Sequence, residues 1–215
     1  MNKQLIIFDM DGTILDTLKD LGNSLNYALT LSHFPEKTLS QVKSYVGNGI
    51  QKLIERALPA GSNEAEVKQV YQDFIAHYEL HCSDFTRPYE GIPELIRTLR
   101  RRGYKTAVVS NKADPAVQEL CLRFFPGLFD LAVGERLGYA RKPEPDLVSL
   151  VLSELQISPA NALYIGDSEV DIATARNADI DSLIVDWGFR DAHFLQSRGA
   201  CCIVSSCREI LEKLP

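Results

Sequence analysis

Two aspartates, separated by one residue, follow the first apolar segment of the chain. The segment spans residues 5–8, and the sequence continues as Asp-Met-Asp-Gly-Thr, so the pair is Asp9 and Asp11. Aspartate and glycine are common turn residues, and a turn is one interpretation. A turn needs only one aspartate, however, and two carboxylates beside a buried strand repel each other unless a cation or a proton lies between them. The spacing therefore indicates chemistry in which two carboxylates share a positive charge.

Three further polar motifs contain residue types that handle phosphate or metal ions. Hydroxyls and amides donate hydrogen bonds to phosphate oxygens, a lysine contributes a positive charge, and carboxylates bind hard cations such as Mg²⁺. Taken singly, Ser110 is more often a helix N-cap and Lys142 a solvated surface lysine. Residue type alone therefore does not give these motifs a function. The motifs are Ser110-Asn111-Lys112, Lys142-Pro143-Glu144-Pro145 and Asp167-Ser168-Glu169-Val170-Asp171.

These motifs need elements that bring them together, and the apolar pattern predicts a parallel sheet. Short apolar segments bounded by turn residues alternate with helical patterns, which is typical of strand-helix-strand units. Open α/β sheets bind ligands at the carboxyl ends of their strands. We therefore expect a Rossmann-like α/β core, a parallel sheet flanked by helices. The predicted strands are 5–8, 106–109, 128–133, 162–165, 182–185 and 201–204, and the predicted helices are 93–102, 115–125, 143–155 and 170–178.

The alternation stops in residues 17–87, where only helical spacing remains. The sequence therefore predicts a catalytic core of residues 1–16 and 88–215, interrupted by an all-helical cap. Because the insertion follows the first strand, it must leave and rejoin the sheet at the ligand-binding edge, and it is expected to act as a lid. Hinges are expected near residues 16–18 and 85–89.

The four motifs occur in the order found in the haloacid dehalogenase superfamily, whose phosphatases open with D-x-D-G-T at the end of the first strand. The chain resembles the phosphatases of this superfamily that carry a helical cap, and the resemblance spans nearly its whole length. One short motif is weak evidence, whereas four in order are strong. The resemblance implies a magnesium-dependent phosphatase acting on a small phosphate ester.

The resemblance also implies roles for the aspartates. Asp9 is the nucleophile that attacks phosphorus and carries a transient aspartyl-phosphate. Asp11 protonates the leaving oxygen and then takes a proton from the hydrolytic water. The Asp9 carboxylate, the Asp11 backbone carbonyl and Asp167 are the implied ligands of Mg²⁺.

Phosphoryl transfer depends mainly on positioning and on neutralising charge, so the remaining polar residues are expected to hold the phosphate. Asp171 stands four residues after Asp167 on a predicted helix and faces the same side. It is expected to orient Lys142 or a metal-bound water without itself binding the metal. The implied phosphate-binding residues are Thr13, Ser110, Asn111 and Lys142.

A Gly-Asn-Gly sequence in the predicted cap precedes a helical pattern. A tight turn is the simplest interpretation. Alternatively, the amides at this helix start could receive a substrate carboxylate, helped by a nearby cation. The segment resembles the cap of phosphoglycolate phosphatases, so 2-phosphoglycolate, hydrolysed to glycolate and phosphate, is the predicted substrate. The predicted specificity residues are Gly47, Asn48, Gly49, Lys52 and Arg56.

Three other functions are compatible with parts of this pattern. A phosphosugar mutase of the β-phosphoglucomutase type shares the two aspartates and a helical cap, and it would yield an isomer instead of free phosphate. Dehalogenase chemistry is disfavoured, because those relatives do not use the metal arrangement of Asp11 and Asp167. Outside enzymes, a non-catalytic module that binds a phosphometabolite remains open, and turnover separates it from the others.

The composition excludes several classes of partner. The formal net charge of −6 argues against nucleic-acid binding, which uses clustered Lys and Arg. No apolar run is long enough to cross a membrane, and the first apolar segment is too short for a signal peptide. The five cysteines show no paired ligand spacing and are expected to be buried, reduced thiols. We expect a cytoplasmic monomer or homodimer whose partner is a small phosphate ester.

Overall fold

The computed structural model describes residues 3–214, which form two compact units. One unit comprises the chain up to Leu15 and from Pro88 onward, and the other comprises Asp16–Arg87. These division points lie within one residue of the predicted boundaries. The assignment of catalysis to the first unit and of a lid function to the second stays a prediction.

The first unit contains a six-stranded sheet with the order β5-β4-β1-β6-β7-β8, and every paired neighbour in it is parallel. The predicted fold class, a Rossmann-like parallel α/β sheet flanked by helices, is confirmed. The central strand is the first in the sequence, so later strands add on both sides of it. The strands are β1 (Leu5–Phe8), β4 (Lys105–Ala113), β5 (Leu131–Glu135), β6 (Ala162–Gly166), β7 (Asp181–Val185) and β8 (Ile203–Val204).

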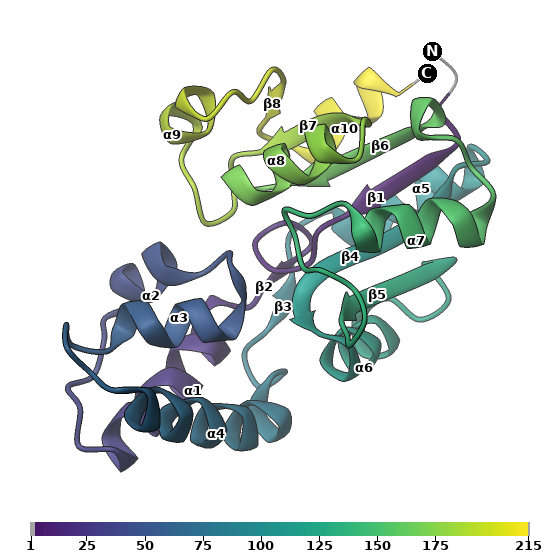
Figure 1. Ribbon diagram of the computed structural model, residues 1–215. Coiled ribbons are helices and arrows are strands. Elements are labelled where there is room, and N and C mark those ends of the chain that lie inside the picture. The colour runs from purple at the N-terminus through teal and green to yellow at the C-terminus, as the bar shows by residue number, and fades with distance from the viewer. Residues whose placement is uncertain (1–2, 215) are drawn as a thin grey trace. The chain divides into compact units, whose positions relative to one another are not determined.

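Helices cover both faces of this sheet (Figure 1). Helices α7 and α8 pack on one face, and α5 and α10 pack against each other on the opposite face. Parallel strands need such crossover helices, which is why the predicted alternation of strands and helices holds. The helices are α5 (Ile92–Arg101), α6 (Asp114–Phe124), α7 (Asp146–Leu155), α8 (Glu169–Asn177), α9 (Ala192–Ser197) and α10 (Cys207–Lys213), with a short 3₁₀ helix η1 (Pro159–Asn161).

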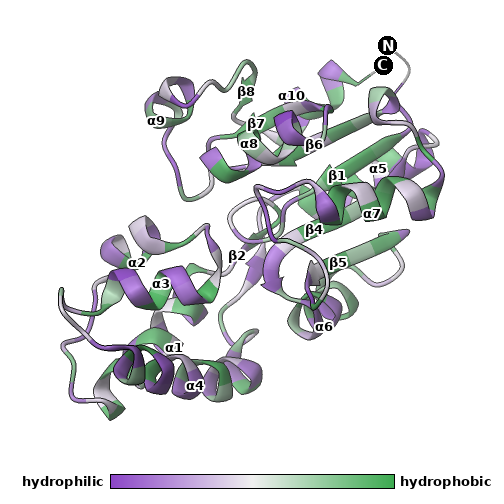
Figure 2. Cartoon of the chain, viewed as in Figure 1, coloured by the Kyte–Doolittle hydropathy of each residue, from purple (hydrophilic) through white to green (hydrophobic). Residues whose placement is uncertain are grey.

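Strand β1 is buried on both sides. All four of its residues are 0% exposed, and Figure 2 shows the central strands in the hydrophobic colour. On one face, Leu5 and Ile7 pack with Val148 and Val151 of α7. A strand that is buried on both faces has apolar residues at consecutive positions instead of at alternate ones, and residues 5–8 show this continuous pattern.

Three elements, β5, α7 and β8, begin later in the chain than predicted. β5 starts at Leu131 rather than at residue 128, because the Leu128 N–H donates to the Phe125 carbonyl in a turn. α7 starts at Asp146 rather than at residue 143, because the Glu144 N–H donates to the Arg141 carbonyl and closes another turn. β8 is likewise shorter than the predicted 201–204.

The second unit is helical, as predicted. In α4 the buried residues Val70, Phe74 and Tyr78 repeat every four positions and pack on α1. The chain enters and leaves this unit through β2 (Leu15–Asp16) and β3 (Arg87–Pro88), which form a two-stranded sheet. Its helices are α1 (Leu18–Leu31), α2 (Leu39–Tyr45), α3 (Gly49–Ala57) and α4 (Glu64–His81).

The remaining fold expectations concern the membrane and the thiols. Among residues 3–214, no helix combines the length and apolar character needed to cross a membrane. All five cysteines are free, but only Cys82 and Cys121 are buried. The prediction of buried thiols is wrong for Cys201, which is exposed, and for Cys202 and Cys207, which are partly exposed.

Candidate active site

The carboxyl ends of β1 and β6 lie side by side and bring the acidic motifs together. Phe8 and Ile165 are paired across these strands, and the Asp9 N–H donates to the Ile165 carbonyl at 2.8 Å. Asp9, Asp167 and Asp171 are all buried, and each offers a ligand atom within 4.8 Å of the other two. Three carboxylates thus meet in one place at the edge of the sheet where ligands bind in such folds.

Lys142 places a cation among these carboxylates. Its Nζ atom lies 2.8 Å from Asp9 Oδ1 and 2.8 Å from Asp171 Oδ1, and it donates to the Tyr164 hydroxyl at 3.1 Å. The Lys142 side chain is only 2% exposed. A lysine so fully buried requires paired charges, which excludes the interpretation of Lys142 as a solvated surface residue.

Burial dominates the protonation of this cluster. Burial, and after it the Asp171 carboxylate, raise the pKa of Asp9 to about 7 despite the neighbouring Lys142. The same two causes raise the pKa of Asp167 well above its ordinary value. Burial alone would lower the pKa of Lys142, but Asp171 and Asp9 outweigh it and raise that pKa. One positive charge therefore faces more negative charge than it can neutralise.

Both oxygens of Asp171 are held by the protein. Oδ2 accepts the Ser168 hydroxyl at 2.6 Å and the backbone N–H groups of Asp167 and Ser168 at 3.2 and 3.1 Å. Oδ1 accepts Lys142 Nζ and the Tyr164 hydroxyl. Asp171 caps α8 from within and orients Lys142, so its geometry suits a supporting carboxylate rather than a primary metal ligand.

The loop after β1 is wound tightly around the Met10 carbonyl, which accepts the N–H groups of Thr13, Ile14 and Leu15. Gly12 has φ +86°, a left-handed conformation that favours glycine. This winding holds Asp11 beside Lys112, whose Nζ atom lies 2.9 Å from Asp11 Oδ1. The Lys112 side chain is 2% exposed, so a second buried lysine fixes the direction of the second aspartate.

The predicted phosphate-binding residues are buried, but their side chains differ in what they contact. Ser110 and Asn111 lie within β4 rather than after it, since the strand continues to Ala113. The Asn111 side chain accepts the Lys142 N–H at 2.8 Å and donates to the Lys142 carbonyl at 3.0 Å. The predicted phosphate contact of Asn111 therefore depends on its backbone, while its side chain anchors Lys142. The Thr13 hydroxyl donates to Asp167 Oδ1 at 3.3 Å.

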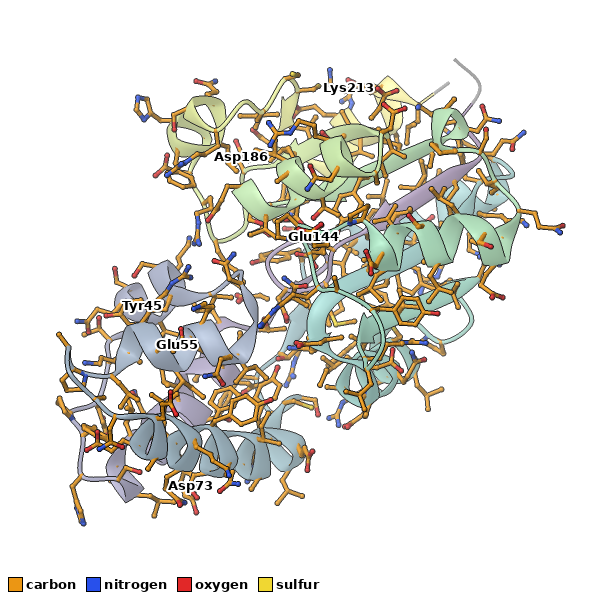
Figure 3. The ribbon with its side chains drawn as sticks, in the orientation of Figure 1. Tyr45, Glu55, Asp73, Glu144, Asp186 and Lys213 are labelled. Carbon is orange, nitrogen blue, oxygen red and sulfur yellow. The ribbon has the colours of Figure 1, made fainter. Side chains whose placement is uncertain are left out.

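The predicted specificity residues surround the start of α3 in the second unit. Gly47 and Gly49 have φ values of 122° and 81°. Arg56, the second-last residue of α3, reaches back and donates to Asn48 Oδ1 and to the Tyr45 carbonyl, each at 2.7 Å. Lys52 instead pairs with Glu55; Figure 3 labels Tyr45 and Glu55. The guanidinium, and not the ammonium, therefore lies at this helix start.

Residues of the cluster suit a hard divalent cation. Mg²⁺ takes oxygen ligands and is commonly held by one or two carboxylates. Asp9 and Asp167 supply buried carboxylate oxygens within reach of each other, and burial, followed by the Asp171 carboxylate, raises the pKa of both, so a cation is needed to keep them ionised together. The donor set and the charge imbalance thus both fit the predicted metal.

Two functional residues were missed in the sequence. Lys112 directly follows Ser110 and Asn111, so its position in this motif could have marked it as a candidate site residue. Its position in a strand, however, does not predict that its side chain contacts Asp11. Tyr164 lies inside β6 and reads as a core aromatic, yet its hydroxyl contacts Lys142 and Asp171. A buried tyrosine needs a partner for its hydroxyl, which is the only sequence-level indication of this role.

Comparisons with known proteins agree with this geometry. A sequence profile of haloacid dehalogenase-like hydrolases matches residues 6–185. The chain is 33% identical to a phosphoglycolate phosphatase of Mesorhizobium japonicum, over 90% of this chain and 87% of that one. It is 31% identical to an N-acetylmuramic acid 6-phosphate phosphatase of Pseudomonas aeruginosa, over 100% of this chain and 96% of that one.

A solved structure matches over the whole length. It comes from Lactobacillus delbrueckii subsp. bulgaricus and is described provisionally as a phosphoglycolate phosphatase. The two chains are 39% identical, with a TM-score of 0.96 over 100% of this chain and 99% of that one.

Proposed function

Because the chain belongs to the haloacid dehalogenase-like hydrolase family, we propose that it is a magnesium-dependent phosphatase that forms an aspartyl-phosphate on Asp9. The predicted class of enzyme, a phosphoric monoester hydrolase resembling phosphoglycolate phosphatases, is confirmed by the family and its relatives. The observation that carries the proposal is the buried cluster in which Asp9 and Asp167 meet beside Lys142.

The orientation of Asp9 suits a nucleophile. Its Oδ1 atom accepts the Met10 N–H at 2.7 Å and lies 2.8 Å from Lys142 Nζ, so one oxygen is fixed and the carboxylate cannot rotate freely. In the first step an Asp9 oxygen bonds to phosphorus as the ester P–O bond breaks, and Asp11 gives a proton to the leaving oxygen. In the second step Asp11 takes a proton from water, whose oxygen bonds to phosphorus and releases phosphate and Asp9.

Charge neutralisation is shared between residues and the metal. Asp9, Asp167 and the Asp11 backbone carbonyl would hold Mg²⁺, which when bound supplies positive charge to the phosphoryl oxygens. Lys142 supplies a second, permanent positive charge from the protein itself, and its three partners keep it in place. Such fixed charge costs no reorganisation during the reaction.

Mg²⁺ binding is expected to release protons near neutral pH. The pKa of Asp9 is raised to about 7 by burial and then by Asp171. Metal-free molecules therefore carry a proton on Asp9 at and below neutral pH, and a cation that needs the carboxylate expels it. Affinity for Mg²⁺ should rise as the pH rises through 7. Isothermal titration calorimetry in two buffers of different ionisation enthalpy measures the protons released, and equal heats at pH 6 would contradict the raised pKa.

The substrate we propose carries a carboxylate beside its phosphate, with 2-phosphoglycolate as the first candidate. The two named relatives are phosphatases of phosphoglycolate and of N-acetylmuramic acid 6-phosphate, both of which are phosphate esters of acids. On this chain, Arg56, whose guanidinium reaches back from the last turn of α3 to Asn48 at the helix start, is the residue proposed to receive the carboxylate, because a guanidinium suits a planar anion.

A substrate panel tests this proposal. Phosphate release is measured with and without Mg²⁺ on 2-phosphoglycolate and N-acetylmuramic acid 6-phosphate, each beside a partner lacking the acid, namely 2-hydroxyethyl phosphate and N-acetylglucosamine 6-phosphate. We expect the acids to be preferred. Arg56→Met should raise the KM for the preferred acid about tenfold, the value of one charge-assisted hydrogen bond, and leave the partner unchanged. Equal rates on acids and partners would reduce the function to a general phosphatase.

A further inference from the structure

The segment that follows β7 lies next to the proposed metal ligand. β7 pairs in parallel with β6, with Gly166 opposite Ile184, so the carboxyl ends of the two strands are neighbours. Asp167 follows β6, and the chain leaving β7 continues from Asp186, which Figure 3 labels, into Trp187. None of the four sequence motifs includes this segment.

Its backbone binds Asp167 directly. The Phe189 N–H donates to Asp167 Oδ2 at 2.6 Å, while the Thr13 hydroxyl donates to the other oxygen, Oδ1, at 3.3 Å. The two donors come from opposite ends of the sequence and fix both oxygens of a carboxylate that is 1% exposed. Partners of this kind orient a metal-binding carboxylate and tune its affinity.

Gly188 allows this close approach. A Cβ atom at Gly188 would lie closer than 3.0 Å to Asp167 Oδ2 and to the Gly12 carbonyl oxygen. A Cβ at Gly12 would also come that close to Asp167 Oδ2. Since the φ of Gly188 lies outside the left-handed region, the backbone itself accepts alanine there. The need for glycine at this position is therefore steric, and it concerns Asp167 and the loop after β1.

Trp187 joins the same segment to the loop. Its indole N–H donates to the Thr13 carbonyl at 3.1 Å. Its ring also lies 6.4 Å from the ring of Tyr89, whose N–H donates to the Ile14 carbonyl. Thr13 and Tyr89 stand next to β2 and β3, through which the chain enters and leaves the helical unit. The only tryptophan of the chain thus contacts both connections close to where they leave the core.

We propose that Trp187, Gly188 and Phe189 form a positioning element that fixes Asp167 for the metal and ties it to the loop carrying Asp11 and Thr13. The inference rests on the proposed magnesium site. The Phe189 N–H orients the Asp167 carboxylate. Gly188, which has no side chain, leaves room for the loop after β1 to pack against that carboxylate, and the Trp187 indole donates to the Thr13 carbonyl of the same loop. Occupancy of the site is therefore expected to change the surroundings of Trp187.

Two measurements on the full chain test this element. The first is Mg²⁺ affinity by calorimetry for Gly188→Ala, which we expect to be weakened at least about tenfold. Val204→Ala, a core truncation in the neighbouring β8, is the matched control; it should lower the melting temperature but leave the Mg²⁺ affinity unchanged. An unchanged affinity in Gly188→Ala, or an equal loss in Val204→Ala, would overturn the proposal.

The second measurement is tryptophan fluorescence during Mg²⁺ titration, which needs no core variant to fold. We expect a change in Trp187 emission that saturates with the calorimetric affinity and also occurs in Arg56→Met, but is lost in Asp167→Asn. Saturating heat without any change in emission would overturn the coupling while leaving the phosphatase proposal intact. If the native chain neither binds Mg²⁺ nor releases phosphate, the proposed function fails first and this inference fails with it.

Discussion

Asp9→Asn is expected to lower the rate of phosphate release by roughly 10⁴-fold or more. The same variant is expected to stabilise the metal-free protein above pH 7. The loss follows because an amide cannot attack phosphorus, and removing a nucleophile costs most of the catalytic acceleration. The gain in stability follows from burial, which, with Asp171, raises the pKa of Asp9 to about 7. Ionised Asp9 is therefore unfavourable in the metal-free fold.

The pH dependence of this effect has a definite sign. The pKa of Asp9 is higher in the folded protein than its usual 3.8, so the folded state binds more protons between these values. The contribution of Asp9 to stability is fully present below about pH 4 and is lost as the pH rises through 7. The stability of the native protein relative to Asp9→Asn should therefore be greatest near pH 4 and fall until the pH exceeds 7.

Thermal unfolding in the presence of a chelator, from pH 5 to pH 8, measures this difference, and a phosphate-release assay measures the activity. Asp179→Asn is the matched control, because it makes the same chemical change at an exposed position and should leave the activity and its pH dependence as they are. Turnover retained in Asp9→Asn would move the nucleophile to another residue. A constant stability difference across this pH range would contradict the raised pKa.

The sequence predicts this site well where the chemistry depends on strand ends. Asp9 and Asp167 each follow an apolar segment, and parallel strands place their carboxyl ends at one edge of the sheet. Predicting that the two strands belong to one parallel sheet was therefore enough to predict that the two aspartates lie close together. Helical spacing predicts Asp171 on the same side as Asp167; the structure brings the two together through the start of α8 instead, because Asp167 precedes the N-cap Ser168 and its N–H donates to Asp171 Oδ2. These predictions depend on local periodicity, which a sequence displays directly.

Contacts between distant loops could not be predicted in the same way. Lys112 and Asp11 are 101 residues apart, and their pairing depends on how far β4 extends beyond the neighbouring strand. The predicted strand ended at residue 109, which left the direction of Lys112 undefined. The bond between Phe189 N–H and Asp167 is made by a backbone group, which carries no residue-type signal. Side-chain direction and backbone donors both follow from tertiary structure, not from pattern.

The position of α7 shows why a local rule failed. Proline is favoured in the first turn of a helix, and this predicted a helix from residue 143. The chain instead bends before Asp146, and the bend lets Asn111 bond the backbone of Lys142 on both sides. Had the helix begun at Pro143, Lys142 would have been its cap. The observed bend is what turns the lysine inward to Asp9 and Asp171.

That inward lysine leads to the second large expected effect. Lys142→Met keeps much of the length and apolar character of the side chain but removes the positive charge between Asp9 and Asp171. Removing one partner of a buried ion pair leaves an uncompensated charge, and such changes cost about 3–5 kcal/mol. We expect this loss in the free energy of unfolding, measured in urea at pH 8, together with loss of phosphate release.

A double variant separates charge from shape. Lys142→Met combined with Asp171→Asn removes the lysine together with a buried carboxylate, while the asparagine oxygen can still accept the N–H and hydroxyl groups of Ser168. If charge imbalance causes the loss, the double variant should recover much of the stability of the single variant and none of its activity, because Asp9 still lacks its cation. If the double variant is as unstable as the single one, the lysine stabilises the fold through packing and hydrogen bonds to Tyr164. Recovery of activity in the double variant would remove Lys142 from the proposed chemistry.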